Sequence, residues 1–233
     1  MDDLNNDYVT FLTTASCNGK CRYCSVRPWM EKHKGYQMPL QDVVDFVFYS
    51  RESGYKYKQI NFGGGEPFLW GNILSAVEII QNGNITESIV VNTNGLLIDV
   101  AHKAFISELS RLVSRIQISR YIGNESNVRY GVDNFEKVTS VPQVRRPITP
   151  TKPVPGTLPA KCQCIGRGFA HGEVSICAPA RSMGGLKSGI PLKQSYLSEF
   201  GDERENQACC QVCVGNVNIH PHIKWYENEV CHG

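Results

Sequence analysis

The chain has 233 residues, of which 41% are hydrophobic, enough for one sizeable core or for one core with a small appendage. Its 24 Lys and Arg residues nearly balance its 22 Asp and Glu residues, which disfavours a strongly basic nucleic-acid-binding protein and an acidic disordered tail. No apolar run approaches the roughly 20 residues that span a bilayer, and the first seven residues are acidic where a signal peptide would be basic. We therefore expect a cytoplasmic protein that binds neither membranes nor nucleic acids.

The first half of the chain alternates strand and helix patterns. Strands are expected at residues 8–12, 60–62, 88–91 and 115–119, and helices at residues 40–53, 73–80 and 99–112. The first of these helices is expected to end at Gly54 and to have one apolar face, formed by Val43, Val44, Val47 and Phe48. Alternating strands and helices indicate a parallel sheet with right-handed crossovers. Four such units are too few for a closed eight-unit barrel, so the predicted fold class is α/β, with a partial, open β/α barrel.

A proline-rich segment divides the chain. Six of the 12 prolines lie between Pro142 and Pro159, too many for a helix or a central strand. We expect a barrel at residues 1–141, an extended connector at 142–160, and a small region rich in Cys and Gly at 161–233. The window from Lys137 to Gly172 holds six basic and no acidic residues. We interpret this charge as that of a solvated linker; the alternative is a surface that attracts an anionic substrate.

Ten cysteines are the anomaly of the composition. In a reducing compartment, so many cysteines favour a metal or iron–sulfur protein over a disulfide framework. Three lie near the start, at Cys17, Cys21 and Cys24, and the other seven lie between Cys162 and Cys231. This separation suggests two distinct sites.

The first three cysteines form a CxxxCxxC motif directly after the first predicted strand. The spacing lets one loop place three thiolates around a cubane while the fourth iron, without a protein ligand, stays open to a small molecule. A closed zinc site would need a fourth ligand, for which His33 is the nearby candidate. Three unrelated buried thiols are the remaining alternative.

With Tyr23 before its last cysteine, the motif resembles that of the radical S-adenosylmethionine (SAM) superfamily. The resemblance implies a [4Fe–4S] cluster whose open iron chelates SAM. It also implies that one electron cleaves SAM to methionine and a 5′-deoxyadenosyl radical, which abstracts a substrate hydrogen. A reductant such as flavodoxin or ferredoxin would be a partner, together with a small-molecule or peptide substrate.

Further motifs follow successive strands in the order of this family. Residues 63–67, GGGEP, are similar to its GGEP motif, in which glycines let the backbone approach a ligand and Glu66 accepts a hydrogen bond from the SAM ammonium. Residues 92–95, NTNG, end the third strand as the family's TNG does, and on their own they indicate only a turn.

The stretch from 119 to 131 resembles the family's "S-x-D-G … R-G" segment. It departs from that pattern at Arg120-Tyr121, which replaces an apolar–Asp pair, and in an additional residue before Gly131. The resemblance implies that Ser119 contacts the SAM ribose and Arg129 the SAM carboxylate. The complete set expected to bind the cofactor is Tyr23, Gly64, Gly65, Glu66, Asn94, Ser119 and Arg129.

The second cysteine group has the spacing C-x9-G-x4-C, from Cys162 through Gly172 to Cys177, followed by a CxxC at Cys210 and Cys213. Alone, four thiolates suit a rubredoxin-like iron, a structural zinc or a cubane. Gly172 fits a hairpin turn with a return strand from residue 173 to residue 176.

The whole spacing is similar to the twitch domain, the shortened SPASM domain of many radical SAM enzymes. This implies a second, auxiliary [4Fe–4S] cluster with the ligands Cys162, Cys177, Cys210 and Cys213. Cys164, Cys209 and Cys231 are the alternative ligands.

The predicted function is that of a twitch-type radical SAM oxidoreductase, similar to the 2-deoxy-scyllo-inosamine dehydrogenases of the family. Such an enzyme oxidises a small-molecule alcohol, with the auxiliary cluster as electron acceptor. The alternative is peptide or protein modification by crosslinking, epimerisation or maturation. A non-enzymatic iron–sulfur or zinc scaffold is a third possibility, but it would have no use for Glu66 behind a glycine run at a strand end.

Overall fold

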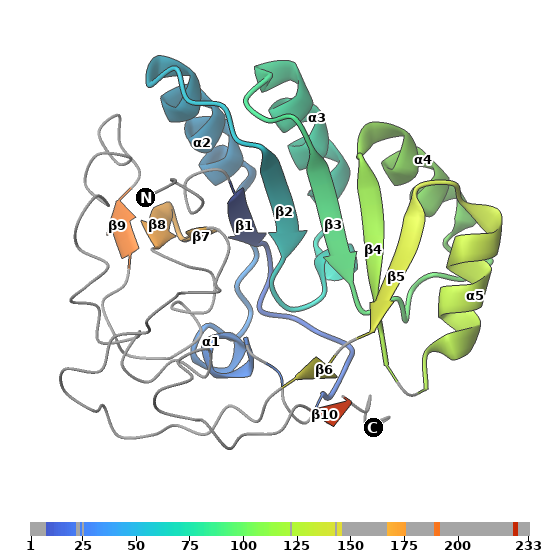
Figure 1. The fold of residues 1–233 in the computed structure, drawn as a ribbon. Coiled ribbons are helices and arrows are strands. Elements are labelled where there is room, and N and C mark those ends of the chain that lie inside the picture. Colours follow the sequence, from blue (N-terminus) through green and yellow to red (C-terminus); the bar gives the residue numbers. More distant parts are fainter. Residues whose placement is uncertain are drawn as a thin grey trace.

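The computed structural model describes residues 8–21, 24, 26–121, 123–142, 144–145, 167–175, 189–191 and 226–227. In these ranges one twisted, open sheet carries helices along one face (Figure 1). The predicted α/β fold with a parallel, open sheet is confirmed. None of the helices in the described ranges is long and apolar enough to cross a membrane.

The sheet has eight strands in the order β5-β4-β3-β2-β1-β7-β8-β9. The strands are β1 (Tyr8–Leu12), β2 (Gln59–Gly63), β3 (Ile89–Thr93), β4 (Arg115–Arg120), β5 (Val138–Pro142), β7 (Arg167–Ala170), β8 (Glu173–Ser175) and β9 (Gly189–Pro191). The first five strands and β7 run parallel, whereas β8 runs antiparallel to its two neighbours, β7 and β9. A separate pair joins β6 (Val144–Arg145) to β10 (Tyr226–Glu227).

The four strands predicted in the first half are present, and β5 is an additional parallel strand. Its sequence VTSVP is short, partly polar and ended by a proline. Pro142 is compatible with β5 because this strand lies at the edge of the sheet, where a missing backbone N–H breaks no ladder.

The parallel register brings the carboxyl ends of the strands together. Leu12, the last residue of β1, lies opposite Gly63, the last residue of β2, and Thr93 at the end of β3 lies opposite Ile118. The loops that follow β1 to β4 therefore line one side of the sheet, the carboxyl edge. The loops that precede these strands line the opposite side, the amino edge.

The helices are α1 (Arg27–Lys32), α2 (Leu40–Glu52), α3 (Ile73–Gly83), α4 (Lys103–Leu112) and α5 (Glu125–Asn134), with a short 3-10 helix η1 (Pro67–Leu69). The helix predicted to begin at residue 99 begins four residues later. The Asp99 carboxylate accepts hydrogen bonds from the backbone N–H of His102 at 3.0 Å and lies 2.7 Å from His102 Nδ1, which forms a turn ahead of the helix.

The predicted apolar face of α2 is wrong at two positions. The buried residues are Val43, Phe46, Val47 and Ser50, whereas Val44 and Phe48 are 40% and 55% exposed. The buried set follows the i, i+3, i+4, i+7 stripe of a helix, and the two exposed residues lie beside that stripe.

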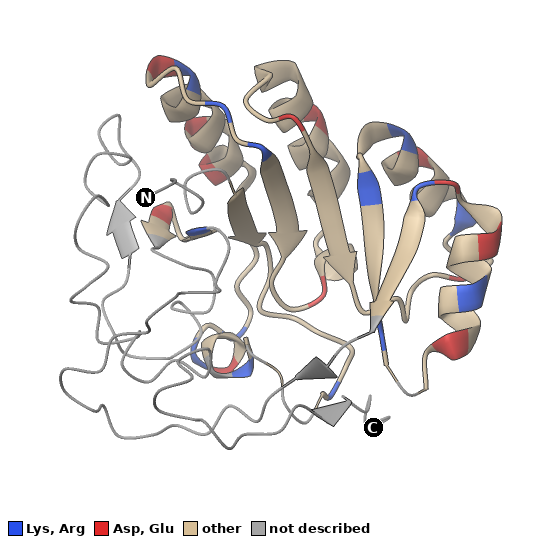
Figure 2. Cartoon of the chain, in the orientation of Figure 1, with Lys and Arg blue, Asp and Glu red and all other residues tan. Residues whose placement is uncertain are grey.

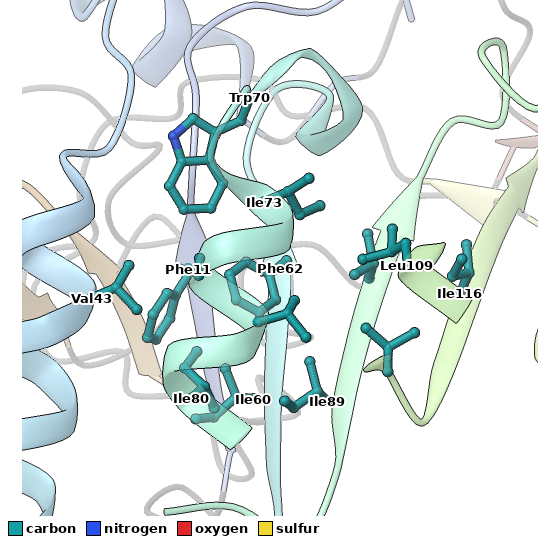
Figure 3. Packing of buried hydrophobic residues seen from close by; sticks show 14 of the residues in the cluster. Phe11, Val43, Ile60, Phe62, Trp70, Ile73, Ile80, Ile89, Leu109 and Ile116 are labelled. Carbon is teal, nitrogen blue, oxygen red and sulfur yellow. The ribbon is translucent and has the colours of Figure 1, made fainter. Parts of the chain in front are cut away.

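The core lies between the sheet and helices α2 to α4 (Figure 3). At its centre, the ring of Phe11 is 5.4 Å from that of Phe62 and 4.9 Å from that of Phe169. Because Phe169 belongs to β7, the hairpin formed by β7 and β8 shares the core of the barrel strands. Its turn is His171-Gly172, with φ of 54° and 63°, which agrees with the predicted hairpin turn at Gly172.

Candidate active site at the carboxyl edge

Buried polar side chains gather at the carboxyl edge. Six of the eight buried polar or charged side chains among the described residues follow strands there: Thr13, Thr14, Glu66, Thr93, Asn94 and Asn124. Burying a polar group costs free energy unless it is hydrogen-bonded. This concentration of buried hydrogen-bonded groups marks the edge as the candidate site.

The glycine-rich turn packs against the segment that leads to the first cysteine. Gly65 N–H donates to the Thr14 carbonyl and Glu66 N–H to the Ser16 carbonyl, both at 2.7 Å. A Cβ atom at Gly65 would lie 2.0 Å from Ser16 O, and one at Gly64, where φ is +121°, would lie 2.9 Å from Thr13 N. The glycines therefore allow two backbone segments to meet, a reason different from the ligand approach that the sequence suggested. Whether Gly64 and Gly65 also contact a cofactor stays a prediction.

Glu66 is the buried carboxylate of this edge, with 1% of its surface exposed. Its Oε1 accepts from Phe68 N at 3.1 Å and from Thr93 Oγ1 at 2.7 Å, and its Oε2 accepts from Asn94 N at 2.8 Å. Burial raises the pKa of Glu66 to about 7, although these three hydrogen bonds lower it. Among the described residues, no cation is one of the groups that shift this pKa.

Asn94 connects this carboxylate to the cysteine loop. Its backbone N–H binds Glu66, while its side-chain Nδ2 lies 2.8 Å from Asn18 Oδ1 and 3.8 Å from Cys17 Sγ. Its Oδ1 accepts from Leu96 N at 2.9 Å, which holds the amide in place. The end of β3 is thereby tied to both the end of β2 and the cysteine loop.

Among the described residues, the three cysteines of the first group form no disulfide, and each is half-buried. A Cβ atom at Gly19 would lie 3.6 Å from Cys17 Sγ and 3.9 Å from Cys21 Sγ, so the glycine leaves space between two sulfur atoms. Within the described residues, three thiol, carboxyl or imidazole groups do not converge closely enough to form a complete metal-ligand set.

The pKa of Cys17 indicates that this loop needs an added positive charge before the thiol ionises. Burial, together with smaller contributions from Glu66, Cys24 and Cys21, raises the pKa of the Cys17 thiol to about 11. The Gly19 N–H, 3.3 Å from Cys17 Sγ, opposes the rise. A thiolate forms here when a cation joins the site, and coordinated iron supplies that charge. The donor set therefore fits an iron–sulfur cluster.

One further buried donor lies beside this loop. Trp29 of α1 is 1% exposed and packs in a small cluster with Leu12, Met30 and Ala170, which Cys17 and Cys24 also contact. Among the described residues its indole Nε1 has no hydrogen-bond partner. Sulfur atoms of a cluster accept such N–H bonds, so this orphaned donor also fits a cluster in the loop.

Asn124 is a site residue that the sequence analysis missed. Its Nδ2 donates to Asn94 O at 2.7 Å and to Ser119 O at 2.8 Å, and its Oδ1 accepts from Tyr121 N at 2.9 Å. It precedes α5 at the N-cap position, where Asn is common, but its side chain bonds across strand ends instead of capping the helix. The Gly123-Asn124 pair, which predicts a turn before a helix, was the available signal.

The other predicted site residues differ in how they relate to this network. Ser119 is half-buried, and its carbonyl is held by Asn124, whereas Arg129 is exposed on α5. The zinc candidate His33 packs its ring against those of Trp29, at 5.5 Å, and His171, at 4.5 Å. The predicted residues outside the described ranges are Tyr23, Cys162, Cys164, Cys177, Cys209, Cys210, Cys213 and Cys231.

Known proteins resemble the chain in sequence and in fold. It is 31% identical over 94 residues to the GTP 3′,8-cyclase of Chlorobaculum tepidum, a match that covers 40% of this chain and 27% of that protein. It is 30% identical over 138 residues to a probable GTP 3′,8-cyclase of Methanococcus maripaludis, covering 55% and 45%. The chain thus spans less than half the length of these curated relatives.

A solved structure, BtrN in complex with AdoMet and 2-DOIA, shares the fold with a TM-score of 0.62. That match covers 92% of this chain and 94% of BtrN at 16% sequence identity. Residues 11–143, more than half of the chain, match the sequence family described as the Radical SAM superfamily. With three thiols, a buried carboxylate and their hydrogen-bond network at the carboxyl edge of an open parallel sheet, the chain belongs to the radical SAM superfamily.

Proposed function

We propose that the chain cleaves SAM reductively at a cluster held by Cys17, Cys21 and Cys24, and that it oxidises a small-molecule alcohol. Membership in the superfamily implies SAM and one [4Fe–4S] cluster. When bound, these cofactors supply the difficult chemistry, since one electron from the cluster cleaves SAM to methionine and a 5′-deoxyadenosyl radical. The observation that carries the proposal is the buried carboxylate of Glu66, which has no cationic partner among the described residues and is linked to Cys17 through Asn94.

Glu66 would bind the ammonium group of SAM. A carboxylate has about four acceptor positions, and three are used here, two on Oε1 and one on Oε2. The remaining position, on Oε2, suits an N–H donor, and a cationic donor would also supply the missing charge. A hydrogen bond to a charged group contributes about 1.5–3 kcal/mol.

The thiolates would be oriented by groups that are already in place. Gly19 N–H and Asn94 Nδ2 point at Cys17 Sγ, and Trp29 Nε1 is a further donor for a sulfur atom of the loop. Gly64 and Gly65 would act through the backbone, by fixing the segment that enters the loop. Ser119 and Arg129 stay proposed contacts of the SAM ribose and carboxylate, as does Tyr23 near the last cysteine.

The substrate step would be a two-electron oxidation of a secondary alcohol. The hydrogen atom of the carbinol carbon goes to the 5′-deoxyadenosyl radical, the hydroxyl proton leaves to a base or to solvent, and the remaining electron goes to an auxiliary [4Fe–4S] cluster. Cys162, Cys177, Cys210 and Cys213 would hold that cluster in a twitch-like part at residues 161–233, after a connector at 142–160. The cysteine spacing supports this proposal, as does a fold match over 94% of BtrN, whose structure was determined with AdoMet and 2-DOIA.

A guanine nucleotide is the second candidate substrate, because the curated relatives are GTP 3′,8-cyclases. Their matches cover 40% and 55% of this chain, so a large part of it is not compared with these relatives. Peptide or protein modification stays the third candidate.

The test is product analysis under anaerobic conditions. Reconstituted protein with SAM and dithionite should release methionine and 5′-deoxyadenosine; if it releases neither, the proposal is wrong. A panel of 2-DOIA and other secondary alcohols, GTP and peptides would then separate the candidates. An alcohol deuterated at the carbinol carbon should transfer deuterium to 5′-deoxyadenosine, while GTP turnover without alcohol turnover would favour the cyclase.

A further inference from the structure

We propose that the side-chain amides of Asn92 and Gln117 bind the substrate, and that this substrate is a neutral alcohol with several hydroxyl groups. The two residues are called the amide pair below. The inference rests on the proposed function and narrows it, because it names the class of alcohol that would be oxidised beside the SAM site.

The amide pair lies on the face of the sheet that points away from the core. Val91, Ile116 and Ile118 are fully buried in the core between the sheet and its helices. Side chains alternate between the two faces along a strand, so Asn92 and Gln117, which are their neighbours in sequence, point to the opposite face. Both are half-buried and therefore partly open to solvent.

One hydrogen bond joins the pair and leaves most of its hydrogen-bonding capacity unused. Asn92 and Gln117 are partners in the register of β3 and β4, and Gln117 Nε2 donates to Asn92 Oδ1 at 3.1 Å. Within the described residues, the Asn92 Nδ2 group, the Gln117 Oε1 atom and the second N–H of Gln117 make no other hydrogen bond. They are also not among the fully buried polar atoms without a partner, so they are accessible to a ligand.

The unused groups match hydroxyl groups better than charged groups. They combine N–H donors with a carbonyl acceptor, and a hydroxyl both donates and accepts. A phosphate or carboxylate only accepts and would leave Gln117 Oε1 unpaired, whereas an ammonium group only donates and would leave the N–H groups unpaired. A substrate with neighbouring hydroxyl groups pairs with both kinds, which matters because enclosing an unpaired polar group costs free energy.

The charges of the barrel strands point to the same class of substrate. In β1 to β5 the charged residues are Arg115 and Arg120, at the two ends of β4 (Figure 2). By alternation Arg115 shares the face of Gln117 and lies two residues nearer the amino edge, whereas Arg120 lies on the other face. A nucleoside triphosphate needs several converging cations. One arginine at the amino end of the face does not supply them, so a neutral ligand fits this face better.

The amide pair lies close to the expected place of the radical. Gln117 precedes Ser119 by two residues in β4, so the two side chains share a face and lie about 7 Å apart. Asn92 likewise precedes Asn94, whose Nδ2 lies 3.8 Å from Cys17 Sγ. Ser119 is the proposed contact of the SAM ribose, whose 5′ carbon carries the radical. A hydroxylated ring held by the pair therefore extends toward the carbon that abstracts its hydrogen.

The experiment measures ligand binding separately from turnover. Two hydroxylated rings, scyllo-inositol and myo-inositol, are titrated calorimetrically into the cluster-loaded protein with SAM, with cyclohexanol as the apolar comparison and GTP as the charged one. The test variant is Asn92→Leu with Gln117→Met, which keeps the approximate size of each side chain and removes its amide. The matched control is Gln59→Met, because Gln59 lies on the same face at the start of β2 and donates in the same way to Asn61 at 2.7 Å. Iron content and urea unfolding show that each variant folds and holds its clusters.

We expect the wild type to bind an inositol more tightly than cyclohexanol or GTP. In the Asn92/Gln117 variant the Kd for that inositol should rise about tenfold or more, because two hydrogen-bonding side chains are lost, while the Kd for cyclohexanol should not rise. Gln59→Met should bind as the wild type does. The single variant Gln117→Met should show a smaller rise in the same direction, which keeps the test decisive if the double variant does not fold.

Three results would overturn the inference: no binding of either inositol, tighter binding of GTP, or an equal loss of inositol affinity in Gln59→Met. Absence of dithionite-driven SAM cleavage in the wild type would instead contradict the proposed function, and the binding titration does not depend on that reaction.

Discussion

The two edges of the same parallel sheet carry polar residues in different ways. At the carboxyl edge the side chains of Glu66, Thr93, Asn94 and Asn124 are buried, and they bond to groups that follow other strands. At the amino edge, polar side chains are exposed or half-buried and bond to backbone groups, either beside them, as when Thr86 Oγ1 donates to Ser88 O at 3.0 Å, or on a neighbouring element, as when Lys137 Nζ donates to Val113 O at 2.9 Å. Both edges link separate elements, but the bonds at the carboxyl edge are made by buried side chains.

The amino edge also contains a cavity of about 390 Å³, whose lining includes Gln81, Glu87, Arg111 and Lys137. A cavity of this size could hold a small molecule. Its polar groups are nevertheless occupied by the loops, since Gln81 Nε2 binds Leu112 O and Lys137 Nζ binds Val113 O. The comparison teaches that a buried, hydrogen-bonded carboxylate is a better guide to the candidate site than an open volume is. Active sites of β/α barrels also lie at the carboxyl edge.

The largest expected effect comes from the cysteines of the carboxyl edge. Reconstituted wild-type protein should hold about eight irons in two cubanes. Changing Cys17, Cys21 and Cys24 together to Ala should leave about four irons and abolish SAM cleavage, as measured by iron assay and 5′-deoxyadenosine release. Changing Cys177 and Cys213 to Ala should also remove about four irons yet leave SAM cleavage measurable. A wild-type protein that holds zinc, or one cluster, would contradict the two-site proposal.

Gly65→Ala tests whether the carboxyl edge depends on close backbone contact. The new methyl group would lie 2.0 Å from Ser16 O, a backbone atom that cannot move without displacing the entry to the cysteine loop. We expect a loss of about 3 kcal/mol in the free energy of unfolding, measured by urea titration, together with poorer cluster retention. The control is Gly71→Ala, because a Cβ atom there meets nothing within 4 Å. Equal effects of the two changes would show that the contact at Gly65 relaxes easily.

The sequence predicts the parts of this architecture that depend on local pattern. Apolar runs locate β1 to β4, and Gly172 locates the β7–β8 turn, because alternation and left-handed turns follow from the residues themselves. The sequence does not predict the pairing of β7 with β1, which depends on a contact between segments more than 150 residues apart.

The candidate site also has one part that the sequence predicts and another that depends on the folded structure. Motif spacing identifies Glu66 and Asn94, but the role of Asn124 is set by two carbonyls, Asn94 O and Ser119 O, that meet it only in the folded chain. The need for glycine at position 65 also arises only in the folded chain, because a side chain there would collide with Ser16 O. The apolar face of α2 was wrong at Val44 and Phe48 because a helix with apolar residues on several sides does not specify from its sequence which side meets the sheet.

A smaller effect is expected from the carboxylate itself. Glu66→Gln should weaken SAM binding by about tenfold to a hundredfold while the cluster is retained, since it loses a charge-assisted bond of about 1.5–3 kcal/mol. Calorimetric titration of the cluster-loaded protein would measure this loss. The control is Glu87→Gln, the same change on an exposed residue of the amino edge. Unchanged SAM affinity in Glu66→Gln would show that the glycine-rich segment is only a structural turn.

The pH dependence of Glu66 has a definite sign. Its pKa in the fold is raised from 4.5 to about 7, so without SAM the carboxyl stabilises the fold fully below pH 4.5. That contribution is lost as the pH rises through about 7, and Glu66→Gln should remove the slope from the free energy of unfolding. The SAM affinity should change in the opposite direction and rise with pH, because ionised Glu66 is the form that accepts a hydrogen bond from an ammonium group. Binding to the wild type should therefore tighten across this range more than binding to the Gln variant.

The smallest effect should come from the amino edge, at Lys137. Its Nζ lies 2.9 Å from Val113 O and 3.5 Å from Arg111 O, at the end of α4, where a cation compensates the last carbonyls of a helix. Lys137→Met keeps most of the apolar stem and removes the charge, which should lower the free energy of unfolding by about 0.5–1 kcal/mol. High salt should reduce this loss, because the ammonium group is exposed to screening. SAM affinity should match that of the wild type, since Lys137 bonds to carbonyls at the end of α4, on the side of the sheet opposite the carboxyl edge. A loss of SAM affinity as large as that of Glu66→Gln would show that the two edges are coupled through the strands, and the division of roles between them would be wrong.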